Sequence, residues 1–160
     1  FRKMKQNLIY LVEDDHLYAN LVISFLKKKG YENIIHYANG TACLDNLYKL
    51  PELVILDYQL GDENGLDVLK KIKGYDPDIH VAFLSGQKQL NVAIDSLKYG
   101  SVDYIVKDEM AMPHLSEILQ RLEKLNHAIQ KNKRRKQLKK ILASTVLIPS
   151  ILGLTYYFFM

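Results

Sequence analysis

Five short apolar runs, each followed by apolar residues at helical spacing, organise most of the chain. The runs are rich in Val, Ile and Leu and do not alternate with polar residues, which is typical of strands that helices cover on both faces. The predicted strands are residues 7–12, 33–37, 52–57, 79–84 and 102–106. The predicted helices are residues 17–29, 40–50, 66–73, 90–99 and 113–125.

This alternation of strands and helices predicts the fold class. A strand followed by a helix and a further strand favours a right-handed crossover between parallel strands. Repeated along the chain, it gives an α/β fold with a doubly wound, five-stranded parallel sheet and five helices.

Polar residues stand where the predicted strands end. Glu13 and Asp14 follow the first strand, Asp57 ends the third, Ser85 follows the fourth and Lys107 follows the fifth. The carboxyl ends of parallel strands meet at one edge of a sheet, and ligands bind outside that edge. We therefore expect these side chains to form one site.

The residue types at this edge suit phosphoryl chemistry. Converging carboxylates repel one another unless a cation is present, and Mg²⁺ prefers oxygen ligands, to which the carbonyl of Gln59 can be added. Lys107 and Ser85 supply a charge and a hydroxyl for phosphoryl oxygens. Asp57 is then the candidate nucleophile.

Together the motifs resemble the receiver domain of response regulators in two-component signalling. That family has an acidic pair after the first strand, a phosphoacceptor Asp after the third, Ser or Thr after the fourth and Lys after the fifth. The resemblance covers roughly residues 5–127 and implies a flavodoxin-like receiver fold. The matching segments are residues 11–15, 54–57, 83–86 and 103–107.

The resemblance implies a role for each residue of the site. Asp57 would accept a phosphoryl group from a phosphohistidine of a sensor histidine kinase or phosphotransfer protein. Glu13 and Asp14 would hold Mg²⁺ together with Asp57, and Ser85 and Lys107 would contact the phosphoryl oxygens. The chain would act as an enzyme only in assisting its own phosphotransfer and dephosphorylation.

The resemblance also implies a switch and a timer. Tyr104 matches the family's switch aromatic, whose rotamer is coupled to Ser85. Gln59 and Gln87 match the positions that set the lifetime of the phosphoryl group. The altered surface would serve a downstream partner or a homodimer formed through the fourth and fifth helices.

One departure from the family pattern supports an alternative. Lys107 is followed by Asp108 where the family usually has proline after a cis bond. A non-proline cis bond costs about 2.5–4 kcal/mol, so this bond is expected to be trans. The alternative is a receiver-like interaction module that is not phosphorylated. A phosphatase of the haloacid dehalogenase type expects a second acid where Gln59 stands.

Charge divides the chain into three regions. Residues 1–120 have 13 Lys and Arg against 17 Asp and Glu, residues 121–140 have nine against one, and residues 141–160 have no charge. This pattern predicts a basic linker over residues 128–140 and an apolar helix over residues 141–160. Twenty apolar residues in a helix span about 30 Å, the thickness of a bilayer core.

The tail therefore predicts a membrane anchor in contact with lipid. It would hold the receiver domain at the cytoplasmic face of the inner membrane, or leave it in the cytoplasm if the tail is not inserted. A packed or partner-binding helix is the alternative. Specific nucleic-acid binding is not expected, because no length of chain remains for a helix-turn-helix. The single cysteine, Cys43, excludes an intrachain disulfide.

Overall fold

The structure is a computed structural model that describes residues 8–86 and 90–158, with side chains described as far as residue 142. The strands are β1 (Ile9–Val12), β2 (Ile34–Tyr37), β3 (Leu53–Asp57), β4 (Gln59–Leu60), β5 (Glu63–Asn64), β6 (His80–Ser85) and β7 (Asp103–Val106). The helices are α1 (His16–Lys28), α2 (Gly40–Leu44), the 3₁₀ turn η2 (Leu47–Lys49), α3 (Gly65–Tyr75), α4 (Leu90–Lys98) and α5 (Ala111–Phe158).

The main sheet confirms the predicted fold class. Its five strands are parallel and lie in the order β2-β1-β3-β6-β7. The chain runs from β1 outward to β2, then crosses to β3 on the other side of β1 and continues outward to β6 and β7. This strand order is the flavodoxin-like arrangement. The strands adjoin in register, with Tyr10 opposite Val54 and Val54 opposite Val81.

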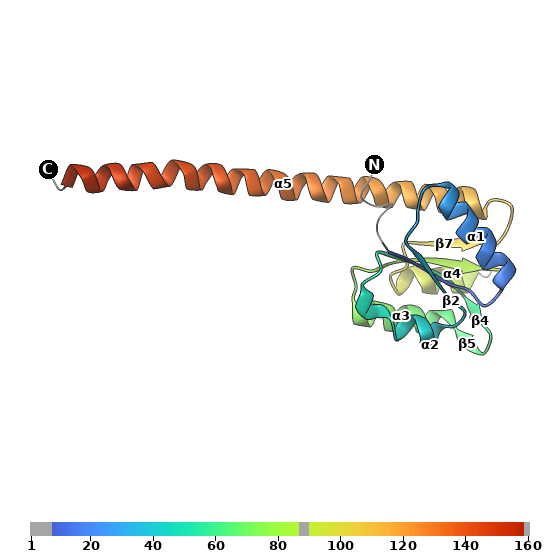
Figure 1. Cartoon of the computed structure of the whole chain (residues 1–160). Helices are drawn as coiled ribbons and strands as arrows, with labels where there is room; N and C mark the ends of the chain where they lie inside the picture. The colour runs from blue at the N-terminus through green and yellow to red at the C-terminus, as the bar shows by residue number, and fades with distance from the viewer. Residues whose placement is uncertain (1–7, 87–89, 159–160) are drawn as a thin grey trace. The chain divides into compact units, whose positions relative to one another are not determined.

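Helices cover both faces of this sheet, which explains why its central strands are mostly apolar. All residues of β1 and β3 are buried. Successive side chains of a strand point to opposite faces: Tyr10 and Val12 join the core under α2, α3 and α4, while Ile9 and Leu11 face the other way. Figure 1 shows α1 on the face opposite to α2 and α3.

Two predicted helices end elsewhere than expected, and one predicted loop is not a loop. The helix predicted over residues 40–50 ends at Leu44, and the 3₁₀ turn η2 follows it. After η2, Leu50 adopts a left-handed backbone conformation (φ 52°) directly before Pro51. Helix α3 continues past Gly74 to Tyr75, and the Lys73 ammonium donates to the Ile79 carbonyl at 2.6 Å, which connects the end of the helix to the segment before β6. The loop after β3 contains the antiparallel hairpin β4–β5.

Helix α4 turns inward a face that matches the prediction only in part. Val92, Ala93, Ile94 and Leu97 are the apolar positions expected to point inward. Val92 is buried as predicted, but Ile94 and Leu97 are 54% and 50% exposed, and Ser96 is buried in their place. The Ser96 hydroxyl donates to the Ala93 carbonyl at 2.9 Å, so its burial leaves no unsatisfied group. Apolar side chains thus remain on the outer face of α4, where the homodimer contact is predicted.

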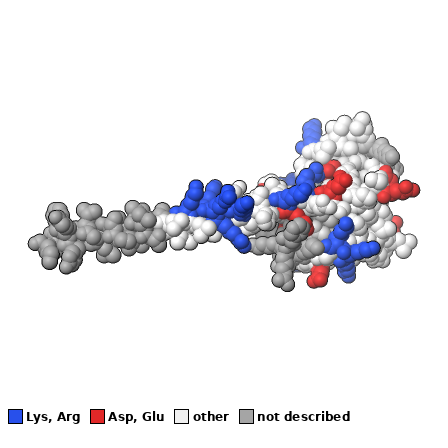
Figure 2. Space-filling view, turned by 90° about the horizontal axis from the view of Figure 1, so that it is seen from above, with Lys and Arg blue, Asp and Glu red and all other residues white. Residues whose placement is uncertain are grey.

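Helix α5 is longer than predicted, because the chain has neither glycine nor proline between Pro113 and Pro149. The chain divides into two compact units, residues 1–120 and 121–160, and α5 belongs to both. In the second unit, residues 131–140 are helical and exposed, and Lys and Arg side chains gather there (Figure 2). The boundaries of the receiver domain, linker and anchor given above stay predictions.

The predicted membrane anchor falls almost entirely outside the described side chains. Within the part of the chain that the structure describes, we find no helix with both the length and the apolar character needed to cross a membrane. Residues 143–160 are not covered by that finding, so the anchor remains a prediction from the sequence.

Two glycines of α3 give a matched test of packing at the end of β3. A Cβ on Gly65 would collide with the Asp57 carbonyl and lie 2.9 Å from the Tyr58 Cα, whereas a Cβ on Gly74 meets nothing within 4 Å. We expect Gly65→Ala to lower the free energy of unfolding by about 2–4 kcal/mol. Gly74→Ala should raise it by about 0.5–1 kcal/mol. Urea unfolding followed by circular dichroism measures both, and equal values would contradict the close packing.

Candidate functional site

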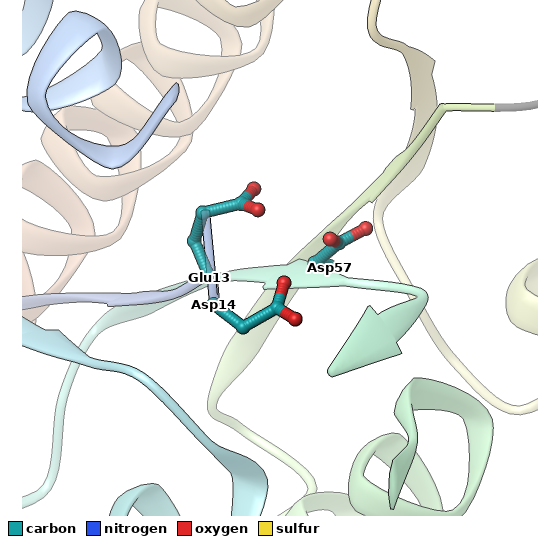
Figure 3. Close-up of side chains that lie close together, drawn as sticks. All are labelled: Glu13, Asp14 and Asp57. Atoms are coloured by element: carbon teal, nitrogen blue, oxygen red, sulfur yellow. The ribbon is translucent and has the colours of Figure 1, made fainter. Parts of the chain in front are cut away.

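The predicted carboxylates meet at one edge of the sheet. Ligand atoms of Glu13, Asp14 and Asp57 all lie within 4.8 Å of one another. Figure 3 shows the three side chains close together. The cause is the register of β1 and β3, in which Val12 lies opposite Leu56, so that the residues that follow them come side by side. The structure therefore confirms that the sheet brings the three acids together.

Glu13 is a fully buried acid. Its Oε1 accepts a hydrogen bond from the Asp15 amide at 3.3 Å, and its Oε2 lies 2.6 Å from the Lys107 ammonium. Burial raises the pKa of Glu13 to about 7, the negative charge of Asp57 adds to this effect, and Lys107 only partly offsets it. The site thus holds an acid that is costly to ionise.

Lys107 connects the two buried carboxylates. Its Nζ lies 2.7 Å from Asp57 Oδ2 as well as 2.6 Å from Glu13 Oε2. Burial works to lower the pKa of Lys107, but the hydrogen bonds to Asp57 and Glu13 outweigh it and raise that pKa. The chain has no cis peptide bond among its described residues, so the bond to Asp108 is trans as predicted, and Lys107 still reaches Asp57.

Asp14 is the exposed member of the cluster. Its Oδ2 accepts a hydrogen bond from the Gly61 amide at 3.1 Å, which ties it to the turn of the β4–β5 hairpin. Gly61 has a φ of 62°, in the left-handed region that favours glycine. Gln59 opens this hairpin, two residues after Asp57, and its carbonyl stays a predicted metal ligand.

Ser85 and Tyr104, the two residues of the switch hypothesis, lie on the neighbouring strands β6 and β7. Ser85 is buried at the end of β6, and its carbonyl accepts a hydrogen bond from the Lys107 amide at 2.8 Å. The Tyr104 ring is half-buried and stacks on Phe83, with centroids 6.2 Å apart and an interplanar angle of 18°. Gln87 lies outside the described residues. The switch and lifetime roles stay predictions.

Tyr18, on the first turn of α1, is a member of the site that sequence reasoning missed. The Lys107 Nζ lies 4.7 Å from the centroid of its ring, a cation–π distance. Its hydroxyl oxygen is buried without a hydrogen-bond partner. Burial and the charges of Glu13 and Asp57 raise the pKa of Tyr18 to about 12. An aromatic one helical turn after Asp14 was the available signal.

The chemistry of this site follows from its charges. Three carboxylates and one ammonium leave a formal charge of −2 in a space where the ligand atoms lie within 4.8 Å. All three acids offer oxygen, the ligand atom that Mg²⁺ prefers, so these residues fit a hard divalent cation. The same ammonium that contacts Asp57 can also contact an anion bonded to it.

Known proteins are similar to this chain in sequence and in fold. The response regulator receiver domain family matches residues 9–123. The transcriptional regulatory protein CssR of Bacillus subtilis (strain 168) is 33% identical over 123 residues, which is 77% of this chain. The regulatory protein LuxO of Vibrio vulnificus (strain YJ016) is 32% identical over 99 residues, 61% of this chain. The crystal structure of the receiver domain of NtrX from Brucella abortus has a TM-score of 0.65 at 27% identity, covering 71% of this chain and 95% of that domain.

The two curated relatives extend well beyond the matched region. The match covers 52% of CssR and 21% of LuxO. The similarity therefore concerns the sheet and its site, and not the remaining parts of those regulators.

Neutralising Glu13 should change how stability depends on pH in metal-free buffer. Because the pKa of Glu13 is raised from 4.5 to about 7 in the folded chain, its contribution to stability is complete below about pH 4.5 and is lost as the pH rises through about 7. We expect the free energy of unfolding of Glu13→Gln to rise relative to that of the wild type, by about 2 kcal/mol as the pH is raised from about 5 to about 8. Urea unfolding in EDTA measures the difference. A difference that does not depend on pH would contradict the raised pKa of Glu13.

Substitutions of Tyr18 should separate its ring from its hydroxyl. Tyr18→Phe keeps the ring beside Lys107 and removes a buried hydroxyl without a partner, so the free energy of unfolding should stay equal or rise by about 1 kcal/mol. Tyr18→Leu removes the ring and should lower it by about 1–2 kcal/mol. In a Lys107→Met background the difference between Phe and Leu should shrink. An unchanged difference there would refute the cation–π contact.

Proposed function

The chain belongs to the response regulator receiver domain family, and on this basis we propose that Asp57 accepts a phosphoryl group in a phosphorelay. The donor would be a phosphohistidine on a sensor histidine kinase or on a phosphotransfer protein. The observation that carries the proposal is the position of Asp57: a carboxylate 4% exposed at the sheet edge, 2.7 Å from the Lys107 ammonium.

The proposed step is a transfer between two nucleophiles. An Asp57 carboxylate oxygen forms a bond to phosphorus while the bond from phosphorus to the donor's imidazole nitrogen breaks, and the electron pair of that bond returns to the imidazole. Lys107 neutralises charge on Asp57 before transfer and can follow the phosphoryl oxygens afterwards. Ser85, at the end of the neighbouring strand, is the proposed hydroxyl donor to the same oxygens.

Glu13, Asp14 and Asp57 are the residues that would hold Mg²⁺, with the Gln59 carbonyl as a further proposed ligand. Their oxygen donors and net negative charge support this assignment. When bound, the cation supplies positive charge that offsets the repulsion between an incoming phosphoryl group and the carboxylates. Because Glu13 and Asp14 directly follow β1, the end of that strand fixes the positions of their carboxylates beside Asp57.

The phosphoryl group would change the surface of the domain through the neighbouring strands. Lys107 and Ser85 are joined by a backbone hydrogen bond, so a shift of either side chain toward a new dianion acts on the ends of β6 and β7 together. Tyr104, packed on Phe83 in β6, is the proposed reporter of that shift. Gln59 and Gln87 remain the proposed determinants of phosphoryl lifetime.

The proposal also concerns what the domain acts on. Relatives of this family are transcriptional and other regulators, so we propose that the domain regulates a partner and turns over no separate substrate. The exposed face of α4, including Ile94 and Leu97, supports a homodimer contact through α4 and α5. The alternative of a module that is not phosphorylated rested on Asp108, and the contact between Lys107 and Asp57 weighs against it.

Intact mass spectrometry tests the proposal. After incubation with acetyl phosphate and Mg²⁺, the wild type should gain the mass of one phosphoryl group, and Asp57→Asn should gain none. The exposed acid Asp62, in the β4–β5 turn, supplies a matched control: Asp62→Asn should be modified like the wild type. EDTA should suppress the gain in every variant.

Two results would refute the proposal. One is a folded wild type that gains no mass from acetyl phosphate or from a phosphorylated histidine kinase. The other is a gain that persists in Asp57→Asn. Circular dichroism on each sample establishes that the protein is folded.

A further inference from the structure

Ten residues of α5 form a basic collar, the name used here for residues 131–140. Seven of the ten carry a positive charge and none carries a negative charge. All ten side chains are exposed, and Figure 2 shows the cations gathered on this part of the helix. The seven are Lys131, Lys133, Arg134, Arg135, Lys136, Lys139 and Lys140.

The cations surround the helix instead of following one face. At 3.6 residues per turn, the seven positions leave no gap wider than about 100° around the helix axis. The largest gap, between Lys133 and Arg134 in projection, contains Gln137. A partner that approaches from one side could therefore meet only part of this charge.

No acid on the helix compensates the collar. Glu123 is the last acidic residue of the sequence, about two helical turns before Lys131. Within the collar, like charges stand four apart at Lys131 and Arg135 and again at Lys136 and Lys140, a spacing that destabilises a helix. A surrounding layer of anions would relieve this repulsion.

The circular arrangement discriminates between possible partners. A second copy of this helix would need an apolar seam, but Lys136 and Lys139 occupy the positions that would continue the spacing of Leu125 and Ile129. A nucleic-acid groove is contacted by one face of a helix. When a helix enters a lipid layer end-on, the lipid headgroups contact the helix from every side.

The sequence after the collar favours that last partner. Residues 141–160 have no charge, and the helix continues through Phe158. Ile141 and Leu142, directly after the collar, are 58% and 63% exposed. A helix from residue 141 to Phe158 is about 27 Å long, close to the thickness of a bilayer core.

We infer that the basic collar binds the anionic headgroups of a membrane, with α5 entering the headgroup layer end-on and the uncharged residues 141–160 lying beyond it. The net charge of residues 1–120 is negative, so the first unit adds no attraction to an anionic surface. The inference does not depend on phosphorylation of Asp57.

A competition between two populations of vesicles tests the inference. The full chain is mixed with equal amounts of phosphatidylcholine vesicles and vesicles that also contain phosphatidylglycerol, each carrying its own dye, and the protein bound to each population is measured. Each basic residue near an anionic surface favours binding about fivefold, so the wild type should prefer the anionic vesicles at least about tenfold at low salt. High salt should reduce that preference.

The variant with Lys133→Gln, Arg134→Gln, Arg135→Gln and Lys136→Gln should lose most of the preference for the anionic vesicles, because four of the seven cations of the collar are removed. Glutamine has a similar helix propensity, so α5 should persist, which circular dichroism can confirm. The matched control removes four exposed lysines from the first unit: Lys28→Gln, Lys49→Gln, Lys71→Gln and Lys98→Gln. It should keep the wild-type preference.

Three outcomes would overturn the inference. The wild type could bind the two populations equally, or the control variant could lose as much preference as the collar variant, which would indicate an effect of net charge alone. The third is retention of the wild type on duplex DNA in the presence of excess anionic vesicles, which would assign the collar to nucleic acid.

Discussion

Two buried carboxylates that share one ammonium are the constraint on which this site depends. Glu13 and Asp57 leave water at the ends of adjacent strands, and Lys107 lies within 2.7 Å of both. Burial of unpaired charges is costly, so the ammonium is what allows the two acids to remain folded side by side. The excess negative charge that remains is the basis for the proposed binding of a dication and for the proposed capacity to accept a phosphoryl group.

The register of the sheet converts this local balance into a link between strands. Asp57 ends β3, Glu13 follows β1, and Lys107 follows β7, so the ion pairs join three of the five strands at one edge. The Lys107 amide extends the connection to β6 through the Ser85 carbonyl. A change of charge at Asp57 therefore acts directly on several strand ends, which is a physical basis for a switch in this fold.

Much of this arrangement could be predicted from the sequence, because apolar runs and polar strand ends are local signals. The predicted strands alone were enough to place three residues, Asp57, Glu13 and Lys107, at the carboxyl ends of β3, β1 and β7. The contact of Tyr18 with Lys107 was missed because it joins residues far apart in the sequence. The inward face of α4 was predicted correctly at Val92 and wrongly at Ile94 and Leu97, because Ser96 donates its hydroxyl to the Ala93 carbonyl and can be buried. The predicted fifth helix is too short, because the basic residues 128–140 were expected to form a linker and instead continue α5.

We propose above all that the edge formed by β1, β3 and β7 directs a phosphoryl group to Asp57. The most direct measurement is reduction of the phosphorylated protein with borohydride, which converts an acyl phosphate on aspartate to homoserine, followed by peptide mass spectrometry. The account predicts homoserine at position 57 alone. Homoserine at Asp14 or Asp15, or modification at no aspartate, would contradict it.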